Sequence, residues 1–130
     1  MLLLIEHHIA QSSIHGLGVF AKVNCRKGDK IWEFNASVDL VIPLSSLENL
    51  PNHVRAMIRK RAEFYPDENI FILGADGDAF MNHSDSPNLL NDGRNGFAAR
   101  DIEVGDEITC DYRSTKVIDF PLYEESSAFE

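Results

Sequence analysis

The sequence has few cysteines, and the two that it has are isolated. Cys25 and Cys110 show neither the paired spacing of a zinc site nor the density of a disulfide scaffold. We therefore expect no bound metal ion. The apolar run Met1–Ile5 is too short to span a membrane, and it lacks the basic flank and long apolar core of a signal peptide. This predicts no contact with a membrane and a cytoplasmic location, or a nuclear one in a eukaryote.

Basic residues are also scarce. Lysine and arginine number 12 against 21 aspartates and glutamates, which gives a formal net charge of −9. A negative protein repels nucleic acid and attracts cations, so direct binding to nucleic acid is disfavoured and a basic protein or peptide is the better-matched partner. The alternative is that the acidity only keeps a small protein in solution. The composition does not indicate the oligomeric state.

The length and composition predict a single globular domain over residues 1–130. Hydrophobic residues make up 44% and charged residues 25% of the chain. Most segments are short apolar runs separated by glycine, proline, Asn or Asp, which is typical of short strands and turns, so we expect a mainly β fold. Asp76–Gly77 and Asp92–Gly93 are predicted hairpin turns. The predicted strands are Leu2–Glu6, Val19–Lys22, Lys30–Phe34, Val38–Ile42, Ile70–Leu73, Gly96–Arg100 and Glu107–Cys110.

One segment has the pattern of a helix. Between Pro51 and Pro66, apolar residues recur at helical spacing, which predicts a helix over Asn52–Phe64. The character of the sequence changes again after Ser114, where aromatic residues mix with glutamates. This tail either docks through its apolar residues or stays frayed.

The first segment with a candidate function is Ile14–Ala21. Gly16 and Gly18 flank Leu17 just before an apolar strand, where the backbone can turn sharply and approach a ligand closely. The segment is not a dinucleotide-binding fingerprint, because it has no third glycine and no helix follows. By itself, it is compatible with an ordinary turn that leads into a strand.

The second segment, Asn82–Asn88, is dense in hydrogen-bonding side chains and follows an apolar pair. The side chains of Asn82 and His83 can both donate and accept hydrogen bonds, which suits recognition of an adenine edge or of amino and carboxylate groups. The alternative role for His83 is that of a metal ligand or a general base. No second His or Cys lies at ligand spacing, which disfavours the metal.

The third segment, Gly105–Tyr112, predicts a turn followed by a strand that ends in a tyrosine. A tyrosine in this position is commonly a buried, hydrogen-bonded phenol of the core.

In this order, the three segments resemble the SET domain. The resemblance extends from about Ile5 to Tyr112, and Ser12–Ile14 and Arg100–Val104 also look similar to the family. It implies a β-clip-like fold of short strands with one short helix and a knot-like threading near the C-terminus, which is an exception to the rule that chains avoid threading. The domain core would be residues 5–112 and the tail residues 113–130.

The resemblance also implies a cofactor, S-adenosylmethionine, and a set of residues that contact it. The glycine turn would offer main-chain groups to the methionine part of the cofactor, and the Asn-His pair would contact the cofactor directly. Tyr112 would be the catalytic residue, at the point where cofactor and lysine meet. In the tail, Phe120 or Tyr123 would fold back over the cofactor. The implied cofactor-binding residues are Gly16, Leu17, Gly18, Asn82, His83, Tyr112 and Phe120.

The sequence departs from the family pattern at three places. Asp85 stands where many relatives have cysteine, the zinc-binding cysteines that often flank the domain are absent, and Cys110 replaces an aromatic residue. The first two departures suggest a small, zinc-free, stand-alone member. The implied function is that of a protein-lysine N-methyltransferase that acts on histone-like or other basic proteins. The alternatives are a catalytically silent SET-like module that binds basic peptides or partner proteins, and an unrelated β-rich interaction domain.

Overall fold

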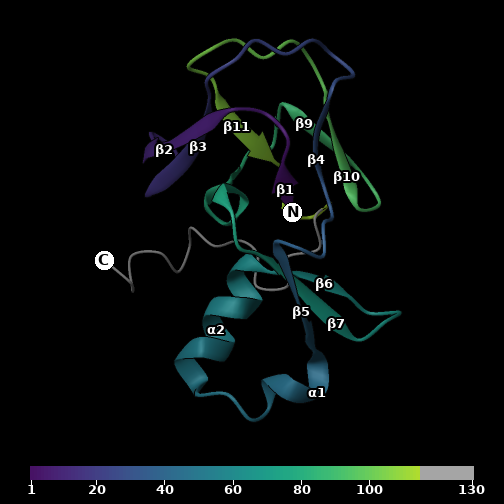
Figure 1. The fold of residues 1–130 in the computed structure, drawn as a ribbon. Coiled ribbons are helices and arrows are strands. Elements are labelled where there is room, and N and C mark those ends of the chain that lie inside the picture. Colours follow the sequence, from purple (N-terminus) through teal and green to yellow (C-terminus); the bar gives the residue numbers. More distant parts are fainter. Residues whose placement is uncertain (115–130) are drawn as a thin grey trace.

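The computed structural model of the chain describes residues 1–114. Within this range, short strands form three sheets, and Figure 1 shows two of them above and the third below with its helices. The first sheet is antiparallel and has the order β1-β4-β10-β9. Its strands are β1 (Leu2–Leu3), β4 (Lys30–Glu33), β10 (Asn95–Ala98) and β9 (Leu89–Asp92).

The second sheet brings together strands that are distant in the sequence. Its order is β2-β3-β11-β8, and its strands are β2 (His7–Gln11), β3 (Leu17–Ala21), β11 (Glu107–Cys110) and β8 (Asn82–His83). The pair of β11 with β8 is parallel, whereas β11 with β3 and β3 with β2 are antiparallel. This sheet therefore contains parts of all three segments that the sequence singles out.

The third sheet belongs to a smaller layer formed by residues 39–74. Its order is β5-β7-β6, and both pairs are antiparallel. A short helix and a longer one lie beside it, and a 3-10 helix follows it in the chain. These elements are β5 (Asp39–Pro43), α1 (Leu44–Leu47), α2 (Asn52–Arg61), β6 (Glu63–Tyr65), β7 (Ile70–Gly74) and η1 (Gly77–Phe80).

The first two sheets form the larger layer of the fold, and each of the two layers has its own hydrophobic core. The larger core lies among the first two sheets and includes Val19, Ile31 and Ile108, none of which is exposed. The smaller core lies between α2 and the third sheet and includes Ile58 and Phe71. Burial of apolar surface in both cores stabilises the fold, and the site described below lies where the two layers meet.

The mainly β class is confirmed, and the predicted strands differ from the observed ones mostly at their ends. Leu2–Glu6 was too long a prediction, because only Leu2–Leu3 pairs with a neighbouring strand. The strand His7–Gln11 was not predicted, since it lies at the edge of its sheet and shows no strict alternation of buried and exposed residues. The strands β6, β8 and β9 were also missed, and they are two to four residues long.

The predicted helix Asn52–Phe64 is α2, but it ends at Arg61. Val54, Ile58 and Ala62 face the smaller core at helical spacing, and the extended backbone of Ala62 starts the connection to β6. The prediction of a single short helix was wrong, because α1 precedes α2.

Gly93 has a φ of 61° in the turn between β9 and β10, as the Asp92–Gly93 hairpin requires. Asp76–Gly77 is instead the start of η1, where the Asp76 carboxylate caps the helix. The knot-like threading remains a prediction.

Candidate active site

The pairing of β8 with β11 brings the second and third segments side by side. Asn82 lies opposite Thr109, and His83 lies opposite Cys110. The backbone N–H of Ser84 donates to the carbonyl of Cys110 at 2.9 Å and extends this pairing past the end of β8. As a result, the side chains that follow β11 lie next to the Asn-His pair.

The side-chain amide of Asn82 joins this pair of strands to the glycine turn. Asn82 is fully buried. Its Nδ2 donates to the carbonyl oxygens of His15 and Leu17, at 2.9 and 3.0 Å, and to Oε2 of Glu107 at 2.9 Å. Between the two carbonyls, Gly16 has a φ of 48°, a left-handed conformation that favours glycine. Asn82 therefore fixes the backbone of the turn.

The carboxylate of Glu107 is the second anchor of the turn. The Ser12 hydroxyl lies 2.7 and 2.9 Å from its two oxygens and also accepts a hydrogen bond from the Ile14 N–H. This arrangement explains why Gly18 is a glycine, because an added Cβ would lie only 2.4 Å from Oε2 of Glu107. The sequence alone indicated no role for Ser12 or for Glu107.

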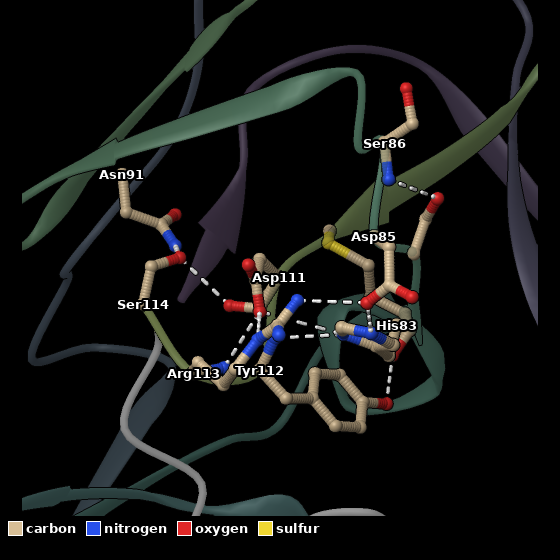
Figure 2. Close-up of polar contacts among 10 residues, drawn as sticks. His83, Asp85, Ser86, Asn91, Asp111, Tyr112, Arg113 and Ser114 are labelled. Atoms are coloured by element: carbon tan, nitrogen blue, oxygen red, sulfur yellow. Dashed lines mark hydrogen bonds and ion pairs between the residues drawn. The ribbon is translucent and has the colours of Figure 1, made fainter.

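His83 is oriented by hydrogen bonds at both ring nitrogens, as Figure 2 shows. Its Nδ1 accepts from the backbone N–H of Tyr112 at 3.1 Å, so the ring hydrogen lies on Nε2, which is 2.8 Å from Oδ1 of Asp85. The ring thus connects Asp85 to the end of β11. Asp85, at which the resemblance implied a cysteine, here holds the histidine.

Arg113 closes the same cluster from the solvent side. Its Nη2 donates to Oδ1 of Asp85 at 2.8 Å, and its Nε donates to Oδ1 of Asp111 at 2.9 Å. The hydrogen bonds from Arg113 lower the pKa of the Asp111 carboxyl below its usual value. Both carboxylates lie beside His83 (Figure 2).

The phenol of Tyr112 lies at the junction of the two layers. Tyr112 is 4% exposed. Its hydroxyl donates to the carbonyl oxygen of Met81 at 2.5 Å, and its oxygen accepts from Nη1 of Arg61 at 3.2 Å. The ring also lies against that of His83, with 5.6 Å between the ring centroids. The phenol is thus held from both sides.

A small cavity of about 40 Å³ lies next to Tyr112. Its walls come from both layers and combine apolar and charged groups. Burial raises the pKa of the Asp78 carboxyl to about 8. The lining residues are Met1, Trp32, Arg61, Glu63, Asp78, Ala79, Met81, Cys110 and Tyr112.

The residues that the resemblance selects fit the cofactor that it implies. Oδ1 of Asn82 is buried and has no hydrogen-bond partner in the described part of the chain, although an unpaired buried acceptor is costly. It lies on the same amide whose Nδ2 binds the carbonyls of the glycine turn. A group with several N–H donors, such as an ammonium group, would satisfy Oδ1.

The structure brings together six of the seven sequence-predicted site residues. Gly16, Leu17 and Gly18 form the turn that Asn82 holds, and His83 links Asn82 to Tyr112. Their roles toward a cofactor remain predictions. Phe120 lies outside the described residues, so its placement over the cofactor also remains a prediction.

Nothing in the sequence indicated that Trp32 and Arg61 line the cavity. Trp32 supplies an aromatic wall of the cavity that Cys110 also lines. Arg61 was one of four basic residues on a helix face, and only the fold shows that it reaches Tyr112.

Within residues 1–114, no group of three or more His, Cys, Asp or Glu side chains is placed to hold a metal ion. The helices of the same range are all too short or too polar to cross a membrane.

A mainly β fold in which a glycine turn, a buried Asn-His pair and a terminal tyrosine converge defines a SET-type site. The family model described as "SET domain" matches residues 16–113. The chain therefore belongs to the SET-domain family.

One curated relative is a histone-lysine N-methyltransferase of Schizosaccharomyces pombe that is specific for lysine 4 of histone H3. It is 31% identical over 117 residues, and the match covers 82% of this chain but 12% of the relative. The chain thus spans about an eighth of that relative's length. The family accordingly includes histone-lysine methyltransferases.

Solved structures share the fold. A humanized mutant of the Chaetomium thermophilum Polycomb Repressive Complex 2, bound to an inhibitor, matches with a TM-score of 0.64 and 19% identity, over 83% of this chain and 15% of that chain. A Plasmodium falciparum protein crystallised as a candidate histone methyltransferase matches with a TM-score of 0.57 and 22% identity, over 85% of this chain and 95% of that one.

The packing of Gly18 on Glu107 can be tested by a double-mutant cycle. We expect Gly18→Ala to destabilise the fold by about 1–3 kcal/mol, because the new methyl group must displace the Glu107 carboxylate. Combined with Glu107→Ala, the same substitution should cost much less, since the obstructing group is gone. Urea unfolding of the two single mutants and the double mutant measures this coupling. Additive losses would contradict the contact.

Proposed function

We propose that the chain is a protein-lysine N-methyltransferase that uses S-adenosylmethionine and acts on histone-like or other basic proteins. The proposal is supported by the unpaired Oδ1 of Asn82 beside the glycine turn and by the cavity beside the phenol of Tyr112. The net charge of −9 supports a basic substrate.

The cofactor, when bound, supplies a methyl group that is activated for transfer to an amine. Gly16, Leu17 and Gly18 would hold it through main-chain groups, and Asn82 through Oδ1. His83 would contact it as well, and its own orientation is set by Asp85 and by the backbone of Tyr112. These residues need only bind the cofactor and orient it toward the amine, because alignment of the two reactants can account for most of the rate enhancement of methyl transfer.

The substrate's side of the reaction depends on the cavity beside Tyr112. Its volume of about 40 Å³ suits the end of a narrow side chain. Trp32, Met81 and Cys110 give it apolar walls, which disfavour the charged form of a lysine. The lysine proton leaves to solvent before methyl transfer. The phenol oxygen of Tyr112 then orients the amine.

The second candidate function is a catalytically silent SET-like module that binds basic peptides or partner proteins. The acidic composition is compatible with it. The free acceptor on Asn82 favours the enzyme, because a module without a cofactor would leave this buried oxygen unsatisfied.

Cofactor binding separates the two candidates. We expect the chain to bind S-adenosylmethionine, and Asn82→Ala to weaken that binding by about 1–3 kcal/mol because a buried partner is lost. Isothermal titration calorimetry measures both values. Asn88→Ala is the matched control, since the Asn88 amide is also buried but is fully used by Glu107 and Thr109. It should lower stability and leave the affinity of the folded protein nearly unchanged. Absence of heat and of a thermal shift at millimolar cofactor would reject the enzyme.

Removal of the Tyr112 hydroxyl tests the proposed catalytic residue. Tyr112→Phe should lower methyl transfer strongly while cofactor affinity stays close to that of the parent. The hydrogen bond to Met81 is lost, so stability should fall by about 0.5–1.5 kcal/mol. Radiolabel transfer to a panel of basic proteins, together with thermal unfolding, measures both effects. Full activity in the mutant would disprove the role of the phenol.

Cys110 leads to a prediction about the product. In the family, a tyrosine at this position limits methylation and a phenylalanine lets it continue. Cys110 lines the cavity beside Tyr112, and a thiol is smaller than either aromatic and a weak hydrogen-bonding group. We therefore expect di- or trimethyl-lysine as the product.

Mass spectrometry of the methylated substrate measures the multiplicity. Cys110→Tyr should shift the product toward monomethyl-lysine, whereas Cys110→Ala, the size control, should still allow more than one methyl group. A parent enzyme that stops at monomethyl-lysine with cofactor in excess would refute the prediction.

A further inference from the structure

The smaller layer contributes one permanent cation to the candidate site. Arg61 is the last residue of α2, and its Nη1 donates to the phenol oxygen of Tyr112 at 3.2 Å. The two residues are 51 positions apart in the sequence and belong to different layers. Arg61 also lines the cavity beside that phenol.

The position of Arg61 follows from how α2 ends. Ala62 is fully buried and has an extended backbone, and its N–H still donates to the carbonyl of Ile58. Since Ala62 is anchored in the smaller core and β6 starts at Glu63, Arg61 is fixed at the junction of the layers. Arg61 is half-buried there, between the end of α2 and the cavity.

We propose that Arg61 is a positioning residue of this site: its guanidinium holds the Tyr112 phenol, and its positive charge keeps the lysine amine in the cavity neutral. The proposal rests on the proposed function. An arginine stays protonated at every pH at which an enzyme works, so this charge is constant. A like charge in a cavity with little water disfavours an ammonium group and favours the amine that can accept a methyl group.

Other charged groups face the same cavity, and they partly oppose Arg61. Glu63 lies on β6 and Asp78 on η1, and both line the cavity. The Met1 ammonium, which also lines the cavity, lies 2.6 Å from Asp78 and 2.5 Å from Asp39. Of the titratable groups on β11 and directly after it, Cys110 and Tyr112 line the cavity, whereas Glu107, Asp111 and Arg113 do not. The ring of His83 on β8 packs against that of Tyr112. A substitution of Arg61 alone leaves these other charged groups in the protein, so it tests the charge of Arg61 by itself.

Three variants separate charge from hydrogen bonding. Arg61→Gln keeps an N–H donor and removes the charge, whereas Arg61→Lys keeps the charge. The control is Arg55→Gln, which removes the same charge from an exposed part of α2 where Arg55 binds Asn52. Circular dichroism of each variant reports whether it is folded.

The first readout is the phenol itself and needs neither cofactor nor substrate. The ultraviolet titration of Tyr112 is obtained as the difference between each protein and the same protein with Tyr112→Phe. In Arg61→Gln, the pKa of Tyr112 should rise by about one unit, because a cation that stabilises the phenolate is lost. It should change little in Arg61→Lys and in the Arg55→Gln control. An unchanged phenol titration in Arg61→Gln would overturn the contact.

The second readout is the pH dependence of kcat with saturating substrate, which reports ionisation in the bound complex. In Arg61→Gln, the rising limb should move to higher pH by about one unit, since the bound lysine then keeps its proton more readily. Arg61→Lys should restore the position of the limb. A loss of kcat without any shift would mean a purely structural role and would overturn the proposal.

Failure of the proposed function is distinguishable from failure of this proposal. If the parent protein transfers no methyl group, the proposed function fails, and the role of Arg61 toward lysine fails with it. The phenol titration still decides whether Arg61 contacts Tyr112.

Discussion

The hydrogen bonds of one buried amide hold this site together. The Nδ2 of Asn82 binds two carbonyls of the glycine turn and the carboxylate of Glu107, so it joins the first, second and third segments of the sequence at a single atom. Without it, two backbone carbonyls and a carboxylate oxygen would each lose a donor, and partners lost in a buried site are costly. The parallel pairing of β8 with β11 is what brings Asn82 to that position. The site is therefore a consequence of the strand order and not of any one loop.

The second constraint is the contact between the two layers. Arg94, in the turn between β9 and β10, lies over the ring of Phe34 at 5.2 Å and over that of Tyr65 at 4.8 Å. It also binds Glu68 at 2.6 Å. Cation–π contacts of this kind are individually modest, but here they connect the first sheet to the third. Together with the contact of Arg61 with Tyr112, they fix the helical layer against the sheets that hold the glycine turn.

The sequence predicted the mainly β class and the glycine turn because these depend on local signals. It also indicated Asn82, His83 and Tyr112, through their order in the chain and their resemblance to a family. It did not predict Glu107, because a glutamate at the start of a strand looks like a solvated residue until the partner Asn82 is known. Arg61 and Trp32 were missed for the same reason, since each reaches the cavity only through long-range packing. The edge strand β2 and the early end of α2 depend on tertiary contacts that override local pattern.

The hydrogen bonds of Tyr112 limit what its phenol can do. Its hydrogen is donated to the carbonyl of Met81, which cannot accept a proton in exchange, and one lone pair is engaged by Arg61. A general base must pass on or retain the proton that it takes, and a phenol with its hydrogen committed to a carbonyl is poorly suited to either task. The geometry therefore favours a tyrosine that positions the amine over one that deprotonates it, and the charge of Arg61, which disfavours an ammonium group in the cavity, removes the need for a base at that position.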